Sequence, residues 1–212
     1  MADDYLGKKM EDLASRKKVV KRVSAAKSLD SLLLKNRSCR SWDPSYEVTE
    51  DMLKKIVSVN TMIPCAKNQQ VLRFKLLTGK EAAAFCQFIK LGALLPDMKF
   101  PPDGCEPSAF IIVCSTVPEN KWVDMDLGIS AQSMLLKAVE MGLNGICIGA
   151  FNKEEAKKHV PQGLEPLLVI ALGKGIEKYQ ILHIAEKENH NYFRENGIHY
   201  IPKVRIEDLL IR

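Results

Sequence analysis

The sequence lacks most of the short motifs that identify hydrolases and nucleotide-binding enzymes. It contains no Gly-rich P-loop, no G-x-G-x-x-G after a predicted strand, no Ser-centred nucleophile elbow and no H-E-x-x-H pair. The six cysteines include no C-x-x-C pair, and the four histidines form no zinc-ligand pattern with them. No residues can therefore be picked out for hydrolysis or metal chemistry, which is consistent with chemistry carried by a bound cofactor.

Long hydrophobic runs are also absent. The longest, near residues 110–114 and 167–172, are far too short to span a bilayer, and the charged N-terminus has no signal-peptide pattern. The sequence therefore predicts a cytoplasmic protein with reduced cysteines and no membrane partner. Its length of 212 residues fits one main domain.

Charge is concentrated at one end of the chain. Residues 1–37 hold ten Lys/Arg and five Asp/Glu, which accounts for the whole net charge of +5. The neutral remainder argues against a nucleic-acid surface that extends over the whole chain. Residues 1–28 are predicted to form a basic helical arm outside a single domain of residues 29–212. The basic run 16–22 could contact anionic lipid or nucleic acid, but a solvated helix face is the simpler explanation.

Helices and strands are expected throughout the rest of the chain. The longest predicted helix, residues 124–141, is apolar on several faces and so needs a sheet on one side and a second subunit on another. A Gly/Pro-rich loop over 95–107 is long enough to cover a site, and the tail 192–212 has little core of its own. Other helices are predicted at residues 29–35, after the N-cap Thr49, at residues 81–90 and after Asn152. Strands are predicted at residues 71–78 and 109–116, before Gly149, and at residues 166–173 and 181–185. Gly142 and Gly145 are predicted to end the longest helix.

Two groups of basic residues are candidates for a phosphate site. Arg37, Ser38 and Arg40 combine two planar guanidinium groups with a hydroxyl, a set that matches phosphate geometry. Two arginines near a helix end can equally be surface residues that interact with the helix dipole. Lys203 and Arg205 have alternating spacing, which places both side chains on one face of an extended segment. Together the two ends of the chain could hold one phosphate.

A polar loop, residues 61–70, connects a predicted helix to a predicted strand. Its amides Asn68 and Gln70 can donate and accept hydrogen bonds together, which suits the edge of a heterocycle that carries both N–H and C=O. Loop amides can also satisfy their own backbone. The loop alone does not separate these two interpretations.

Several short motifs follow one another between about residue 32 and the C-terminus. They are Arg37-Ser38-x-Arg40, residues 63–70 leading into Arg73-Phe74, Asp126-x-Gly128-x-x-x-Gln132, Gly142-Leu143-x-Gly145-x-x-Ile148-Gly149, Ala171-x-Gly173 and Lys203-x-Arg205. This ordered set resembles the nitroreductase family of FMN-dependent oxidoreductases.

This resemblance implies an α+β fold with a central, mostly antiparallel sheet flanked by helices. It also implies an intertwined homodimer with a swapped C-terminal arm and FMN between the subunits. By this resemblance, Arg37, Ser38 and Arg40 hold the phosphate and ribityl end, and Lys203 and Arg205 complete the phosphate site. Cys65 and Asn68 line the isoalloxazine ring from the other subunit with Gln70 near it, and Ile148 and Gly149 offer backbone groups beside its N5 edge.

The sequence departs from the family pattern at three places. Asn36 replaces the first Arg, which removes one expected phosphate contact. Cys65 replaces the usual Ser after Pro and is a weaker hydrogen-bonding group that can be oxidised. Val71 and Leu72 replace a Pro-Trp pair, and we interpret them as core residues.

The function implied by the resemblance is the reduction of a nitroaromatic, quinone or similar acceptor. NADH or NADPH would donate hydride to FMN in a ping-pong cycle, with no protein nucleophile. A flavin-binding sensor or carrier without turnover is the alternative. A third possibility is a basic-arm module that binds nucleic acid or membrane.

Overall fold

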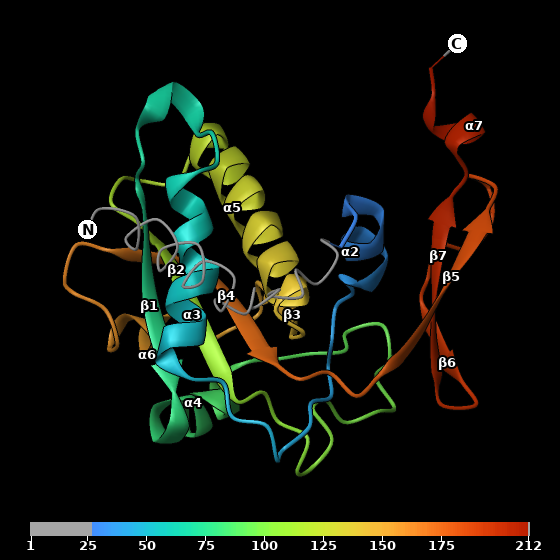
Figure 1. The fold of residues 1–212 in the computed structure, drawn as a ribbon, viewed down its shortest axis with the longest axis horizontal. Coiled ribbons are helices and arrows are strands. Elements are labelled where there is room, and N and C mark those ends of the chain that lie inside the picture. Colours follow the sequence, from blue (N-terminus) through green and yellow to red (C-terminus); the bar gives the residue numbers. More distant parts are fainter. Residues whose placement is uncertain (1–26, 212) are drawn as a thin grey trace, which may run out of the picture.

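A computed structural model describes residues 27–211 (Figure 1). The predicted arm of residues 1–28 therefore lies outside the described residues, except for Lys27 and Ser28. No helix in the described part of the chain is both long and apolar enough to cross a membrane.

A four-stranded antiparallel sheet forms the centre of the domain, in the order β1-β2-β4-β3. The strand β2 is buried along its whole length, in keeping with its β-branched and apolar residues. Because β1 and β3 are the edge strands, each has one side without a strand partner among the described residues. The strands are β1 (Leu72–Thr78), β2 (Ala109–Ser115), β3 (Asn144–Ile148) and β4 (Glu165–Gly173).

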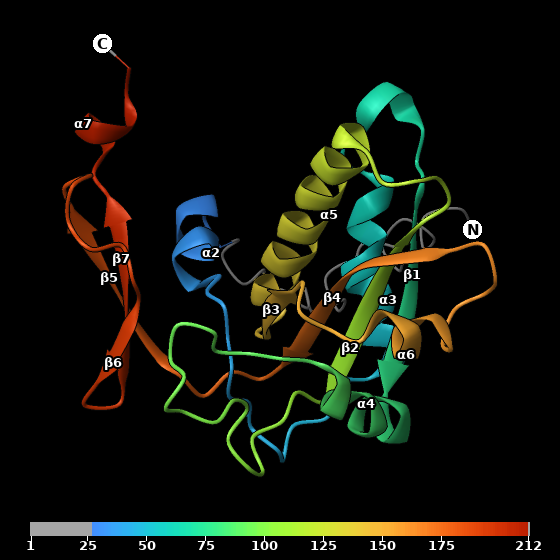
Figure 2. The same cartoon turned by 180° about the vertical axis from the view of Figure 1, so that it is seen from behind.

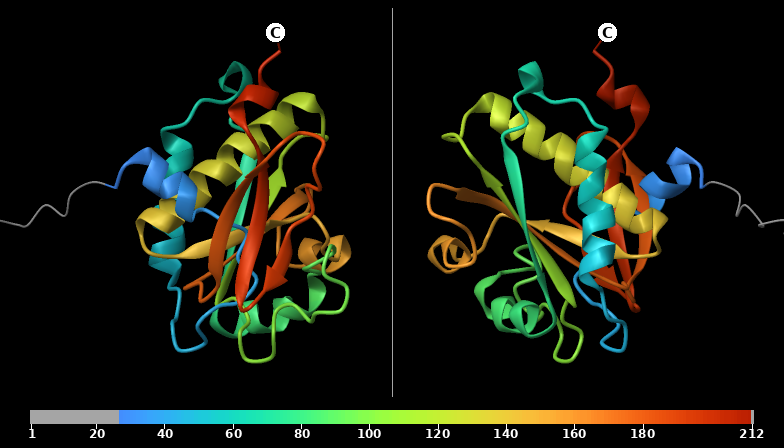
Figure 3. Two further views of the ribbon diagram at one scale, coloured as in Figure 1. Left: turned by 90° about the vertical axis from the view of Figure 1, so that its right-hand side faces the viewer. Right: turned by 60° about the vertical axis from the view of Figure 1, so that its left-hand side comes forward.

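Helices cover both faces of this sheet (Figure 3). One core cluster joins α3 (Glu50–Val57) and α5 (Lys121–Glu140) to the sheet, and a second joins α4 (Gly79–Phe85) and α6 (Lys153–Lys157) to the opposite face. The remaining helical elements are α2 (Leu29–Lys35), α7 (Ile206–Leu209) and three 3-10 turns, η1 (Ser58–Thr61), η2 (Ala66–Asn68) and η3 (Cys86–Phe88).

Side-chain caps fix several helix ends. Thr49 accepts a hydrogen bond from Met52 N, and Asn152 accepts from two backbone amides at the start of α6, as predicted. The helix α5 begins at Lys121, three residues before the predicted start, because Asn120 accepts from the amides of Trp122 and Val123. The predicted helix at 81–90 is wrong at both ends, since α4 starts at Gly79 and gives way to η3 at Cys86.

The glycines after α5 have different roles. Gly142 follows the helix with φ of +85°, a backbone conformation that glycine adopts without strain. Gly145, which we predicted to help end the helix, instead lies within β3 and pairs with Leu172 of β4.

The C-terminal tail forms a second sheet with the order β5-β7-β6. This sheet stands beside the main body, next to α2 (Figures 1 and 3). The strands β5 and β7 are parallel although β6 lies between them in sequence. No strand was predicted in the tail of residues 192–212, yet β6 and β7 lie within it. The bounds are β5 (Lys178–Ile184), β6 (Phe193–Glu195) and β7 (Ile198–Val204).

Candidate functional site

The helix α5 holds two of the predicted site segments at different points along its length (Figure 2). Near its N-terminal end, Asp126 Oδ1 accepts a hydrogen bond of 2.8 Å from Ala66 N. Further along, Gln132 Oε1 accepts one of 3.2 Å from Asn36 Nδ2. These two attachment points are about 9 Å apart along the helix axis, given the rise of an α-helix. Two residues of one sequence motif thus position two separate segments of the chain.

The segment held by Asp126 carries the predicted ring-lining residues. Gln70 Nε2 donates to Asn68 Oδ1 at 3.3 Å, and Cys65 Sγ lies 4.0 Å from the same oxygen. Lys67, Asn68 and Gln70 all have positive φ, between 49° and 53°. For non-glycine residues this conformation is strained, and such strain is concentrated at functional sites. The structure therefore brings Cys65, Asn68 and Gln70 together in a constrained loop.

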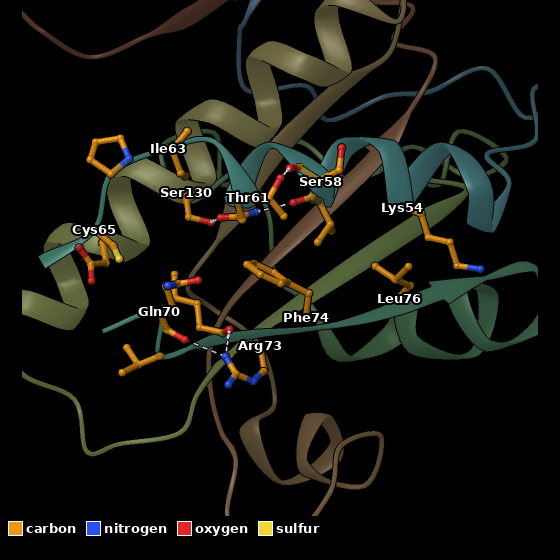
Figure 4. Close-up of a pocket in the computed structure, with 16 residues that line it drawn as sticks. Lys54, Ser58, Thr61, Ile63, Cys65, Gln70, Arg73, Phe74, Leu76 and Ser130 are labelled. Carbon is orange, nitrogen blue, oxygen red and sulfur yellow. Dashed lines mark hydrogen bonds between the residues drawn. The ribbon is translucent and has the colours of Figure 1, made fainter. Parts of the chain in front are cut away.

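A pocket of about 420 Å³ lies beside this loop, between α3, η1, β1 and α5 (Figure 4). Phe74 and Leu76 of β1 contribute apolar surface, whereas Lys54 and Ser58 lie on the opposite wall. The buried carboxylate of Asp126, 5% exposed, also lines the pocket. The pocket is an apolar cavity with polar groups at its edges, which is typical of a ligand site.

The arginine segment, residues 37–40, and the residues directly after it run along the ends of β3 and β4. Cys39 N donates to Gly145 O at 3.1 Å, and Asp43 N donates to Lys174 O at 2.8 Å. Arg37 Nη2 donates to Leu33 O at 2.6 Å, and Arg40 Nη1 donates to Ser38 O at 3.1 Å. The Nε–H groups of both arginines are buried and have no hydrogen-bond partner among the described residues.

A carboxylate fixes the backbone of this segment. Glu177 Oε2 accepts hydrogen bonds of 2.7 Å from Arg40 N and from Tyr179 Oη, and Glu177 also pairs with Arg194 of β6. The Arg40 guanidinium lies 4.8 Å from the centre of the Tyr192 ring, and Arg40 is only 7% exposed. We name these five residues the Glu177 cluster. The sequence contains no signal for it, since its members come from separate segments that only the fold brings together.

Burial shapes the ionisation of groups in and around the cluster. It raises the pKa of the Tyr179 phenol, and it lowers the pKa of the Arg37 guanidinium, a shift that Tyr179 opposes. His199, packed against Tyr179 and Tyr192, has its pKa lowered to about 4 by burial and then by Arg40 and Arg194. The imidazole is therefore neutral near pH 7.

The predicted backbone site at the end of β3 is accessible. Ile148 is 2% exposed and anchors the strand in the core, whereas Gly149 is exposed. A Cβ built on Gly149 would meet no atom within 4 Å. Open space at this backbone allows a ligand to approach closely.

Lys203 and Arg205 lie at the far end of the second sheet. Lys203 and His199 lie on the same face of β7, and Arg205 pairs with Asp208 at 3.7 Å. Among residues 27–211, neither Lys203 nor Arg205 forms a hydrogen bond or ion pair with the segment 37–40. A single chain therefore does not gather all the predicted site residues around one pocket.

The departures from the family pattern have structural counterparts. Asn36 is engaged by Gln132, as described above. Val71 is 8% exposed and Leu72 packs against the core cluster of α3 and α5, which confirms their interpretation as core residues.

A model of the Nitroreductase family matches residues 103–174, from the loop before β2 to the residue after β4. No curated protein matches the sequence at a significant level. The structure is similar to that of a nitroreductase family protein from Clostridium difficile 630, with 23% identity, a TM-score of 0.54, and coverage of 71% of this chain and 86% of that one.

Two further solved structures have the same fold. A putative nitroreductase from Exiguobacterium sibiricum, described in complex with FMN, is 18% identical with a TM-score of 0.56, over 72% of this chain and 90% of that one. An FMN-dependent nitroreductase from Mycobacterium smegmatis, described in complex with NADPH, is 12% identical with a TM-score of 0.57, over 69% and 87%. The family match and these structures confirm the resemblance and the predicted α+β fold.

Proposed function

We propose, with the resemblance to the nitroreductase family as the premise, that this protein is an FMN-dependent oxidoreductase. It uses NADH or NADPH to reduce a small acceptor such as a nitroaromatic or a quinone. The Exiguobacterium and Mycobacterium structures, described with FMN and NADPH respectively, support this choice of cofactor and donor.

The observation that carries the proposal is the pair of unsatisfied guanidinium donors. Buried polar groups in native proteins almost always have partners, and a buried N–H without one costs about 1–3 kcal/mol. The Nε–H groups of Arg37 and Arg40 are such donors, and Ser38 lies between the two arginines in sequence. An anionic or carbonyl-bearing ligand would satisfy them. The residues present therefore fit the phosphate of a cofactor such as FMN.

Bound FMN supplies hydride chemistry between a reduced nicotinamide and an acceptor, in the two half-reactions of a ping-pong cycle. The chain contributes binding and orientation, and we assign it no nucleophile. Arg37, Ser38 and Arg40 bind the phosphate and ribityl end, while Glu177 holds the Arg40 backbone in place. In the complete site Lys203 and Arg205 add charge at the phosphate, Cys65, Asn68 and Gln70 line the ring, and Ile148 and Gly149 present backbone groups at its edge.

A homodimer explains why one chain separates these groups. The outer face of α5 exposes Trp122 and Met125 at 43% and 53%, and α2 exposes Leu29 and Leu34 at 61% and 63%. Apolar area of this kind is typical of a subunit interface. If α5 packs antiparallel to its copy, the Cys65 loop of one subunit, attached near one end of α5, comes close to the arginine segment of the other.

The C-terminal residues fit a swapped arm. Ile206, Leu209, Leu210 and Ile211 are between 60% and 103% exposed in a single chain. The edge strand β1 has one side without a strand partner among the described residues, and the apolar pocket lies next to it. We infer that the C-terminal arm of one subunit covers this edge of the other.

The domain assignment and the cellular location are part of the same proposal. Residues 29–212 form a single FMN-binding domain, and residues 1–28 form a separate basic arm. The protein acts in the cytoplasm, with neither nucleic acid nor membrane as its partner. These statements depend on the sequence and on the resemblance.

Removal of the C-terminal cations tests the site. The double variant Lys203→Ala/Arg205→Ala is expected to bind FMN about 10- to 100-fold more weakly, the loss expected for one or two charge-assisted contacts. Binding is measured by quenching of flavin fluorescence. Lys178→Ala is the matched control, because Lys178 is an exposed lysine at the opposite end of the same sheet. Equal affinity in the double variant and the control would refute the phosphate assignment.

A turnover assay separates the enzyme from a flavin carrier. Steady oxidation of NADH or NADPH after addition of a quinone supports the enzyme. A protein that binds FMN tightly but oxidises neither nucleotide would instead be a carrier or sensor.

A further inference from the structure

The long loop of residues 91–107 begins and ends beside the candidate site. Just before it, Lys90 N donates at 2.8 Å to the carbonyl oxygen of Ala150, the residue after Gly149, and Ile89 forms an isolated bridge with Phe151. Near its other end, Cys105 O accepts a hydrogen bond of 3.0 Å from Trp42 N, two residues after Arg40. Between these points the loop extends past β3 toward β6 (Figures 1 and 2).

Inside the loop, one side chain forms the contact with the second sheet. The Arg194 guanidinium lies 4.6 Å from the centre of the Phe100 ring. The ring also packs against Gly92, where an added Cβ would collide with it, and Gly92 has φ of +78°. Phe100 is thus held between the backbone of its own loop and a guanidinium of β6, in a geometry typical of cation–π attraction.

Arg194 is itself firmly placed. It pairs with Glu177, whose side chain is 5% exposed, and its Nε donates to His199 Nδ1 at 3.4 Å. Since Glu177 also accepts from Arg40 N, one carboxylate connects the arginine segment with the residue that holds the loop. Glu177 therefore contacts both the arginine segment and the residue that holds the loop.

Elsewhere the loop forms hydrogen bonds within itself and carries exposed apolar groups. Its internal backbone hydrogen bonds include Leu95 N to Gly92 O at 2.8 Å and Met98 N to Leu95 O at 3.1 Å. Leu94 and Met98 are 50% and 43% exposed. These two exposed apolar side chains lie on a loop that follows the anchor of Lys90 at Ala150, next to Gly149. Exposed apolar surface of this kind can bind a flat, apolar ligand.

We propose that Arg194 is a positioning residue that clamps Phe100, and that the loop so placed forms one wall of the acceptor site, with Leu94 and Met98 as its specificity-determining residues. This inference rests on the proposed function. The acceptor class that matches the wall is an aromatic quinone or nitroaromatic rather than a small charged oxidant.

Hydrogen–deuterium exchange of the loop amides tests the clamp without reference to activity. In Phe100→Ala, amides 93–99 are expected to exchange at least fivefold faster than in the wild type. Arg194→Lys keeps the charge but not the planar guanidinium, and should shift exchange in the same direction. Phe193→Ala is the matched control, because Phe193 stacks on Tyr200 with ring centres 5.0 Å apart in the same hairpin and, within residues 27–211, makes no aromatic or cation–π contact with the loop.

Acceptor kinetics of the FMN-loaded protein test the wall. Phe100→Ala should raise the KM for a naphthoquinone at least fivefold, while FMN content and the rate of flavin bleaching by NADH stay within twofold of the wild type. Leu94→Ser and Met98→Ser should raise the same KM without changing loop exchange. Ferricyanide, a small charged acceptor, should show no such change.

The outcomes are distinguishable. Loop exchange in Phe100→Ala equal to that in Phe193→Ala would overturn the clamp, and an unchanged naphthoquinone KM in the Leu94 and Met98 variants would overturn the wall. A protein that binds no FMN would contradict the proposed function and with it the acceptor wall. Hydrogen–deuterium exchange of the loop amides would still show whether the Arg194–Phe100 contact holds the loop.

Discussion

His199 makes the stability of the second sheet depend on pH. The side chain is 2% exposed, and its Nδ1 accepts a hydrogen bond from Arg194 Nε. Burial and the charges of Arg40 and Arg194 lower its pKa from 6.5 to about 4, while Tyr179 and Tyr192 pack against the ring. Protonation would remove the Nδ1 acceptor and place a third cation beside two guanidinium groups.

The sign and size of the effect follow from linkage. Below pH 6.5 the unfolded chain binds a proton at His199 that the folded protein does not bind until about pH 4, so the free energy of unfolding falls as pH decreases through this window. This histidine alone should cost about 1–2 kcal/mol between pH 7.5 and pH 5, after allowance for partial solvent screening. The corresponding decrease in Tm is roughly 2–8 °C for a chain of this size.

Thermal unfolding at fixed protein concentration measures the effect. His199→Gln removes the titrating group but keeps an oxygen that can accept from Arg194. The Tm difference between wild type and variant should shrink as pH decreases from 7.5 to 5. His183→Gln, at an exposed position on β5, is the matched control and should follow the wild-type pH dependence. Parallel plots of Tm against pH for the wild type and His199→Gln would refute the reasoning.

Three further predictions concern the body of the domain. Asp126→Ala leaves Ala66 N without its acceptor and should cost about 1–3 kcal/mol and weaken FMN binding, whereas Asp126→Asn keeps an oxygen and should stay close to wild type in calorimetry and flavin titration. Gly145→Ala places a Cβ 2.7 Å from Ala171 O, and should lower stability by about 1–3 kcal/mol in urea unfolding; an unchanged midpoint would contradict this. Met125→Asp, on the exposed face of α5, should yield monomers by size-exclusion chromatography and lose FMN at the same time; a flavin-loaded monomer would refute the interface.

Much of the main body could be predicted because local signals agreed with the final packing. The helix α2 and the N-caps Thr49 and Asn152 are found where the sequence predicts them. The early start of α5 was missed although Asn120 is a favourable N-cap residue, so that signal was present in the sequence. The placement of Gly145 within β3 depends on close packing against Ala171, which periodicity cannot show.

The second sheet and the Glu177 cluster could not be predicted in the same way. The pairing of β5 with β7 is parallel and skips β6, and local sequence does not specify such a partner. Glu177, Arg40 and Arg194 meet only because that sheet stands beside the arginine segment. Of the site residues that the resemblance implies, Cys65, Asn68 and Gln70 lie together in one loop. Their meeting with Arg37 and Lys203 stays a prediction for the dimer.

The visible absorption spectrum of the purified protein, recorded before and after addition of NADH and NADPH under nitrogen, tests the central claim most directly. The proposal predicts a flavin band that loses intensity with at least one nucleotide and returns when a quinone is added. A colourless protein that also fails to bind added FMN would contradict the proposed function.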